Sequence, residues 1–347
     1  MGMSIPVLGA ITASGPREPG WTLLYQGANV TADISAMVLS ITYTDHLGHF
    51  SDDLRIELED RHRKWQGPWF PAQGDLLSLA IGYAGGVMLP CGEFQVDELE
   101  LSGMPDVFHL RCLAAWITPS IRTPKSVGYE NVALPAIAQT VASAHGLTLV
   151  SVPPALNVVY ARVTQKQETD LAFLRRLANE HNYDFSIRSG KLVFYARTAL
   201  EAKAPAFTIS RKDLDRFSFK AMAVGTYSAA RVSYQHPATK ALITQSATDP
   251  QVKNGSTLNL ARRVENGQQA QLRAQAALHA HNMLLTTGEL SGEGDPRLAA
   301  GVVTALHGFG NFDRNYLVMQ SRHALSRMGG YTTSVQIRSV QQSDPGS

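Results

Sequence analysis

The sequence predicts a mainly β protein in which an α+β segment is inserted between two β blocks. Apolar and polar side chains alternate with a period of two in residues 54–59, 77–83 and 331–337, as in strands with one solvated face. Residues 134–141 instead carry apolar side chains at the i, i+3, i+4 and i+7 spacing of an amphipathic helix. Several short strands between turn residues favour an antiparallel barrel or sandwich at each end of the chain.

Residues 1–117 form the first predicted domain, which is β in character. Beyond the alternating segments already named, residues 107–113 are expected to form another strand. The apolar positions of the preceding segment change phase between Val96 and Leu99. Because side chains in a regular strand alternate strictly between its faces, this change predicts a β-bulge near Asp97.

Residues 118–205 form the second predicted domain, of α+β type. The amphipathic helix is expected to end at Gly146, and Thr169 is a suitable N-cap for a second helix with an apolar stripe. Ser189 and Gly190 then separate two alternating segments, which is the signal of a two-residue hairpin.

Residues 206–340 form the third predicted domain, a return to β structure with one helix at 268–284. The polar, turn-rich segment 235–261 is expected to be a long loop or an irregular hairpin, and the tail 341–347 is expected to fray. Strands are expected at 217–221, 229–234, 301–306, 316–321 and 331–340. Their order repeats that of the first block, which suggests two related barrels in one chain.

The composition bears on the class of protein. Lys plus Arg is 31 and Asp plus Glu is 29 in 347 residues, so a strongly basic nucleic-acid binder is excluded. Charged residues are 17% of the chain, against about 25% in an ordinary soluble domain. Few charges with a 44% hydrophobic content indicate a component of an assembly, whose partners cover much of its surface.

Targeting signals and covalent cross-links are not predicted. The N-terminus lacks the pattern of a secretory signal, and no run of residues is apolar for long enough to predict a membrane span. Cys91 and Cys112 are too few for a disulfide framework or a thiolate zinc site, and they are expected to be small core residues in strands. The chain is therefore expected to be made in a cytoplasm.

The histidines do not form a convincing chemical site. His46, His49 and His62 fall in a predicted loop region, where solvent-exposed side chains are the better interpretation than metal ligands. His279 and His281 are two residues apart on a predicted helix and point to different faces, so they are expected at the surface or an interface. We predict no catalytic residue, no metal and no cofactor.

The aromatic segment from Trp65 to Pro71 is the most unusual local feature. Flat apolar rings can stack on sugars, so a carbohydrate platform is one interpretation. The other is a loop whose rings pack over the open end of a barrel or at a subunit contact. Packing or contact is favoured because a sugar site also needs converging polar groups.

A series of short motifs follows in order along nearly the whole chain. They are LRIELED at 54–60, Trp65 and Trp69, PAQGDLL at 71–77, IGY at 81–83, CGEFQVDEL at 91–99, HGL at 145–147, TDLAFLRRLA at 169–178, GDP at 294–296 and GYTT at 330–333. In this order the sequence resembles the late-control D, or baseplate-hub, family of contractile phage tails.

The resemblance implies two tail-tube-like antiparallel β-barrels in tandem and a homotrimeric ring, so that three chains present six barrels to a six-fold tail tube. It implies as partners a tail tube protein, a central spike protein, and the tape-measure and baseplate wedge proteins. The family is also related to proteins of pyocin-like particles and to the N-terminal part of type VI secretion spikes. Since no spike repeat is fused to this sequence, a separate spike polypeptide is expected. The implied location is the baseplate of a virion tail or of a bacteriocin particle, assembled in the bacterial cytoplasm.

The leading hypothesis is a non-enzymatic structural hub whose lumen can pass DNA without binding it specifically. One alternative is a tail-associated peptidoglycan hydrolase that uses the aromatic segment and Glu57, Glu59 or Asp60; another is a glycan-binding tail-tip module. The candidate interface residues lie in the aromatic segment and in the expected barrel walls: Trp65, Trp69, Leu77, Leu79, Ile81, Tyr83, Tyr331, Thr333 and Val335.

Overall fold

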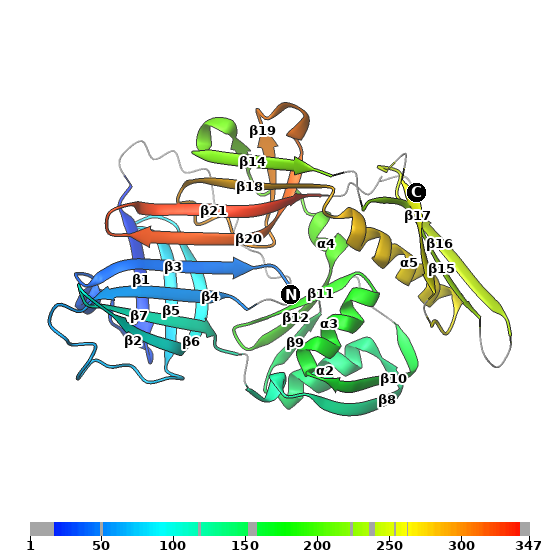
Figure 1. The fold of residues 1–347 in the computed structure, drawn as a ribbon, viewed down its shortest axis with the longest axis horizontal. Coiled ribbons are helices and arrows are strands. Elements are labelled where there is room, and N and C mark those ends of the chain that lie inside the picture. Colours follow the sequence, from blue (N-terminus) through cyan, green and yellow to red (C-terminus); the bar gives the residue numbers. More distant parts are fainter. Residues whose placement is uncertain are drawn as a thin grey trace.

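A computed structural model of the chain confirms that it is mainly β (Figure 1). It describes residues 17–48, 51–116, 119–151, 158–222, 225–235, 240–252, 255–261 and 263–340. The predicted tail at 341–347 and His49 lie outside the described residues. Most strands belong to one large sheet, and three smaller sheets account for the others.

The first β module is built from the N-terminal third of the described chain. Its elements are β1 (Pro19–Tyr25), β2 (Ala28–Asn29), α1 (Thr31–Ile34), β3 (Val38–His46), β4 (Asp53–Glu59), β5 (Leu76–Tyr83), β6 (Met88–Ser102) and β7 (Val107–Ala114). The strands pair antiparallel in the order β3-β4-β7-β6-β5-β1-β2. The register of β6 on β7 shifts between Val96 and Glu98, which confirms the predicted bulge. Cys91 and Cys112 are buried in these strands as free thiols, as predicted.

The α+β module follows. Its elements are η1 (Pro119–Arg122), β8 (Lys125–Ala133), α2 (Leu134–Ala144), β9 (Thr148–Ser151), β10 (Val159–Glu168), α3 (Asp170–Glu180), β11 (Tyr183–Arg188), β12 (Lys191–Ala196) and α4 (Arg197–Glu201). Both predicted helices and the predicted hairpin are confirmed. Leu134, Ile137 and Val141 of α2 are buried against Phe173 and Leu177 of α3 in one core.

The second β module is formed by strands that are separated along the chain. Its elements are β13 (Thr208–Ser210), η2 (Arg211–Asp213), β14 (Arg216–Ala221), β18 (Thr286–Glu293), β19 (Val303–His307), η3 (Gly310–Phe312), β20 (Asn315–Ser326) and β21 (Gly330–Ser339). The main path is β14-β18-β21-β20, and β19 joins β20 to β13. Alternate residues of β20 and β21, among them Val318 and Val335, fill a separate core.

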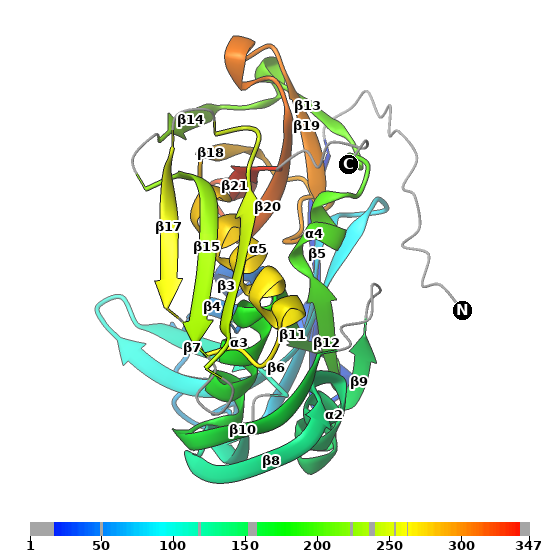
Figure 2. The same cartoon turned by 90° about the vertical axis from the view of Figure 1, so that its right-hand side faces the viewer.

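A smaller side unit interrupts the second β module between β14 and β18. It contains β15 (Tyr227–Gln235), β16 (Leu242–Thr248), β17 (Ser256–Ala261) and α5 (Gly267–Asn282). In Figure 2 the yellow strands of this unit lie in front of α5, and the two layers share their own apolar core. The helix predicted at 268–284 is thus confirmed. Of the two alternatives for 235–261, the long loop is wrong, since β16 forms an antiparallel hairpin with β15 and β17 adds a parallel strand to it. Two strands form there because Ile243, Leu258 and Leu260 pack toward α5.

The two β modules are joined edge to edge. β3 pairs antiparallel with β20 from Ser40↔Ser326 to His46↔Gln320, so one sheet runs from β14 through to β2 (Figure 1). Among the described strands, the order of strands in this sheet has two free ends and does not close into a barrel. The helices that the structure describes include none that is long and apolar enough to cross a membrane.

Candidate functional site

One face of the large sheet is continuously polar across both β modules. Directly paired residues of adjacent strands lie on the same side of a sheet. Ser291 of β18 pairs with Ser334 of β21, Ser334 pairs with Arg322 of β20, and Arg322 pairs with Thr44 of β3. The same register continues from Thr42 to Arg55. Side chains of both signs share this face, among them Arg55, Glu57, Glu98, Glu100, Arg111, Arg216, Glu289 and Arg322. The opposite face carries the apolar cores, so this polar face is the surface available for contact with other molecules.

In the first β module, several charges on this face are paired locally. Arg111 contacts Glu98 at 3.3 Å, and Ser40 donates a hydrogen bond to Glu57 at 2.8 Å. Arg55 lies 3.3 Å from Asp53. A face with interspersed, partly neutralised charges offers no concentrated patch of one sign to a polyanion.

A partly buried ion pair, with a guanidinium that is partly exposed and carboxylates that are not, fastens the α+β module to the first β module. Arg188 of β11 contacts Asp45 of β3, and its Nη2 lies 3.5 Å from Asp52 Oδ2. Asp45 also accepts a hydrogen bond from the Ala300 backbone N–H at 2.8 Å, which brings in the second β module. Burial raises the pKa of Asp52 to about 7, although Arg188 opposes the shift. Two carboxylates therefore share one guanidinium where three parts of the chain meet.

A second buried cluster joins α4, α5 and β21. Glu201 accepts a hydrogen bond from Arg338 Nη2 at 2.6 Å and lies 3.0 Å from His279 Nε2. Burial alone would raise the pKa of Glu201, but the hydrogen bond with His279 and the charge of Arg338 lower it below its ordinary value. His279 was expected at the surface or an interface, and it is buried because it pairs with this carboxylate. Neither cluster follows from the sequence, because the partners lie far apart along the chain.

The predicted interface residues lie mostly inside the chain. Eight of the nine are buried, and Trp69, which is 37% exposed, is the exception. Tyr83 and Tyr331 meet edge to face at 5.4 Å, and the Tyr83 hydroxyl donates to the Gly294 carbonyl at 2.7 Å. The two groups of predicted wall strands thus contact each other between the β modules. Their role in an intermolecular interface stays a prediction. Of the nine residues, Trp69 is the one whose side chain is exposed for such a contact.

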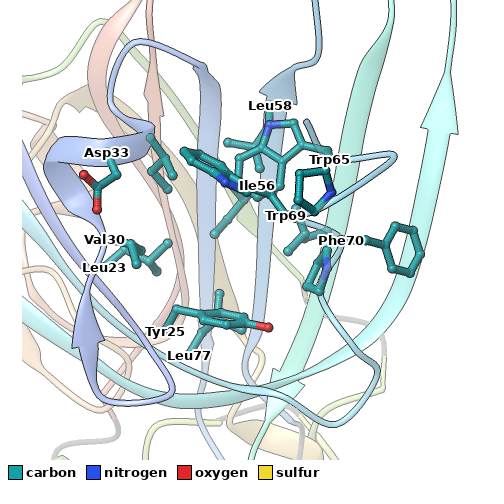
Figure 3. A pocket seen from close by; sticks show the side chains of 14 residues that line it. Leu23, Tyr25, Val30, Asp33, Ile56, Leu58, Trp65, Trp69, Phe70 and Leu77 are labelled. Carbon is teal, nitrogen blue, oxygen red and sulfur yellow. The ribbon is translucent and has the colours of Figure 1, made fainter. Parts of the chain in front are cut away.

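The aromatic segment packs against the core of the first β module and forms one wall of a pocket (Figure 3). Trp65 is buried, stacks on Phe108 at 6.0 Å and meets Trp69 edge to face at 5.5 Å. Asp60 holds the segment in place, since its Oδ1 accepts from the Trp65 backbone N–H at 3.2 Å. The pocket has a volume of about 330 Å³. Its lining is Leu23, Tyr25, Val30, Asp33, Ile34, Ile56, Leu58, Trp65, Pro68, Trp69, Phe70, Pro71, Leu77 and Leu110.

The residues considered for sugar binding or hydrolysis make structural contacts. Lys64 Nζ lies 4.5 Å from the centre of the Trp69 ring and so occupies one face of that indole. Glu59 contacts Arg327 at 3.2 Å, while Glu57 and Asp60 make the hydrogen bonds given above. Within the described ranges, no three or more His, Cys, Asp or Glu side chains form a group that could hold a metal ion.

Comparison with known proteins gives the family. The model of the phage tail baseplate hub (GPD) family matches residues 115–328, which is more than half of the chain. The chain belongs to the phage tail baseplate hub family. The resemblance carried by the sequence motifs is thereby confirmed.

Two curated members of the hub family align with most of this chain. The "Probable baseplate hub protein" of Escherichia phage P2 is 30% identical over 236 residues, and that of Escherichia phage 186 is 29% identical over 230 residues. These alignments cover 66% and 65% of this chain. The chain spans 60% and 58% of the length of these two relatives.

A solved structure shows the same fold. The crystal structure of the 43 kDa tail protein of prophage MuSo2 from Shewanella oneidensis superposes with a TM-score of 0.70 and 16% sequence identity. The match covers 92% of this chain and 98% of that chain. The overall fold of the chain is therefore shared with a tail protein at low sequence identity.

Proposed function

We infer that this chain is a structural baseplate hub of a contractile tail or pyocin-like injection particle. It forms a trimeric ring that joins the six-fold tail tube to the three-fold central spike. Family membership supports this role, and so does the single sheet that unites two β modules under one polar face. Two similar modules per chain would present six repeats in a trimer, which matches a six-fold tube.

The tandem tube-like barrels belong to this proposal. The first would be made by residues 1–117 and the second by residues 206–340, with residues 118–205 as the domain between them. The continuous polar face would line the lumen, because its paired charges suit a channel that passes DNA or protein without retaining it. The open edges of the large sheet, at β14 and at the β1–β2 end, would pair with neighbouring subunits.

The partners in this proposal are the tail tube protein, the central spike protein and, around them, the tape-measure and wedge proteins. The hub is not an enzyme in this proposal, since its candidate acids are held in structural hydrogen bonds and ion pairs. It resides in the baseplate of the virion tail or bacteriocin particle, after assembly in the host cytoplasm.

The test is reconstitution with the tail tube protein and the central spike protein of the same particle. We expect native mass spectrometry of the mixture to give complexes with three copies of this chain, and electron microscopy to show three-fold density at the end of the tube. A chain that stays monomeric and joins neither protein would overturn the proposal. Clearing of a peptidoglycan suspension by the purified chain would contradict its non-enzymatic part.

A further inference from the structure

The part of the polar face that belongs to the second β module carries free positive charges. Arg216 of β14 pairs with Ser291 of β18, and Ser291 pairs with Ser334 of β21. Ser334 in turn pairs with Arg322 of β20, so these four side chains form one row across four adjacent strands (Figure 1). Both arginines are exposed, and neither forms an ion pair or a side-chain hydrogen bond with the residues that the structure describes. The row therefore ends in a free guanidinium on each side and contains no carboxylate.

The row lies in a hollow of the sheet face. The hollow has a volume of about 410 Å³, and besides the row its polar lining is Ser218, Glu289, Gln320 and Gln336. A second hollow shares these four residues and adds Lys220, which is exposed and also without an ion pair in the described ranges. Three free cations, two in the row and one beside it, thus accompany the single carboxylate of Glu289.

The first β module has the opposite balance on its part of the same face. There Arg111 is paired with Glu98, and Arg55 with Asp53. Glu57 and Glu100 add two carboxylates that pair with no Lys or Arg of the described chain. A polyanion is therefore attracted by one part of the face and repelled by the other, which keeps any contact weak.

The side chains in and around the row are of the types that contact phosphates. At least half of the hydrogen bonds in protein–DNA complexes go to phosphate and sugar oxygens, and Arg, Lys, Ser and Gln side chains are among their donors. Arg216 and Arg322 are three strand spacings apart, which is about 14 Å at about 4.8 Å per spacing. Since a nucleic-acid strand carries a charge on every nucleotide, it can reach both arginines whatever its sequence. A polypeptide reaches both only where its acidic side chains have the matching separation.

We propose that this row contacts the phosphodiester backbone of a nucleic acid that moves along the polar face. The guanidinium groups of Arg216 and Arg322 bind phosphate oxygens, and the hydroxyls of Ser291 and Ser334 donate to others between them. This inference rests on the proposed function, which places the face in the lumen, and it names nucleic acid as the cargo. With three cations engaged, the affinity should fall about 200-fold between about 20 mM and about 150 mM salt, so the contact guides the cargo without retaining it.

Fluorescence anisotropy of the full chain with a labelled 12-base-pair duplex of mixed sequence tests the contact. Titrations from about 15 mM to about 100 mM NaCl give the slope of log affinity against log salt, which we expect to be about −2.7. Arg216→Gln combined with Arg322→Gln should make the slope shallower by about 1.8 and weaken binding at the lowest salt at least about tenfold. Arg216→Lys with Arg322→Lys, which keeps both charges, should keep the slope.

Arg231→Gln is the matched control, because it removes an exposed arginine from β15 of the side unit and should leave the slope unchanged. The proposal is overturned if the chain does not bind the duplex at about 15 mM salt, or if the double Gln variant keeps the wild-type slope. It is also overturned if decaglutamate competes as well as a ten-nucleotide strand, since the occupant would then be an acidic polypeptide. A chain that binds the duplex as expected but forms no complex with tube and spike proteins would contradict the proposed function alone.

Discussion

Arg188, Asp45 and Asp52 show how individual side chains hold distant parts of this chain together. Asp45 and Arg188 are separated by 143 residues in the sequence, and their contact places an ion pair with a buried carboxylate and a partly exposed guanidinium between two modules. Removing Arg188 would leave the buried Asp45 carboxylate without its counter-ion, which destabilises the fold. The sequence could not predict this cluster, since Asp45 lies in a strand that is not predicted from the sequence and nothing near it indicates Arg188.

Asp52→Asn is expected to change how stability depends on pH. Since burial raises the pKa of Asp52 from 3.8 to about 7, the folded state keeps a proton that the unfolded state loses between about pH 4 and pH 7. The wild-type free energy of unfolding therefore receives a contribution that falls as pH rises through this window. The Asn variant lacks that contribution.

Urea unfolding at about pH 4.5 and about pH 7.5 measures this effect. The unfolding free energy of Asp52→Asn minus that of the wild type should rise by about 3 kcal/mol between the two pH values. Asp97→Asn, at an exposed position, is the control and should show a nearly constant difference. A constant difference for Asp52→Asn as well would show that this carboxyl is ionised in the folded state throughout.

At the scale of single elements, local signals predicted the structure well. Both helices of the α+β module, the hairpin at Ser189–Gly190 and the bulge beside Asp97 were accessible because capping, periodicity and turn chemistry act over a few residues. Several strands were not predicted, including β3, β10 and β18. β18 carries Gly288 and Gly292 at alternating positions, where neighbouring backbone and side-chain atoms leave no room for a Cβ without displacement. Such a strand has little apolar periodicity to detect.

Thr169→Ala tests the N-cap of α3. The Thr169 hydroxyl oxygen accepts a hydrogen bond from the Ala172 backbone N–H at 3.1 Å, so its removal should lower the free energy of unfolding by about 1 kcal/mol. Thr140→Ala, at an exposed position inside α2, is the matched control: its hydroxyl donates to the Ala136 carbonyl at 2.9 Å but caps no helix, and because alanine has the higher helix propensity this variant should not lower the free energy of unfolding. Faster amide exchange at Ala172 would locate the effect at the helix start; equal exchange in the two variants would contradict a capping role.

At the scale of the whole molecule, the family and the mainly β class followed from the order of motifs and strands. The joining of the two β modules did not, because β3 and β20 lie at opposite ends of the chain. The side unit was also missed as a separate body, since its helix was assigned to the second β block. The packing of α5 on β15 and β16 depends on contacts between residues far apart in the sequence, which composition cannot predict.

Tyr331→Asp tests the contact between the two β modules. Tyr331 is buried, its hydroxyl is hydrogen-bonded to His323 Nδ1 at 2.7 Å, and its ring meets Tyr83. An unpaired carboxylate in this place should cost at least about 3 kcal/mol and reduce the yield of assembled particles. Tyr331→Phe, which loses only the hydroxyl, should cost about 1 kcal/mol. Thermal unfolding and particle yield measure both variants, and an unchanged yield for Tyr331→Asp would refute the prediction.

The β3–β20 ladder has a mechanical consequence. Its hydrogen bonds run between antiparallel strands from Ser40↔Ser326 to His46↔Gln320, so a pull along the strand direction loads all of them together instead of one after another. Sliding one β module past the other along the strands would require breaking the whole ladder at once. A force applied along the strand direction to one end of this subunit would therefore reach the other end with little slippage between the modules.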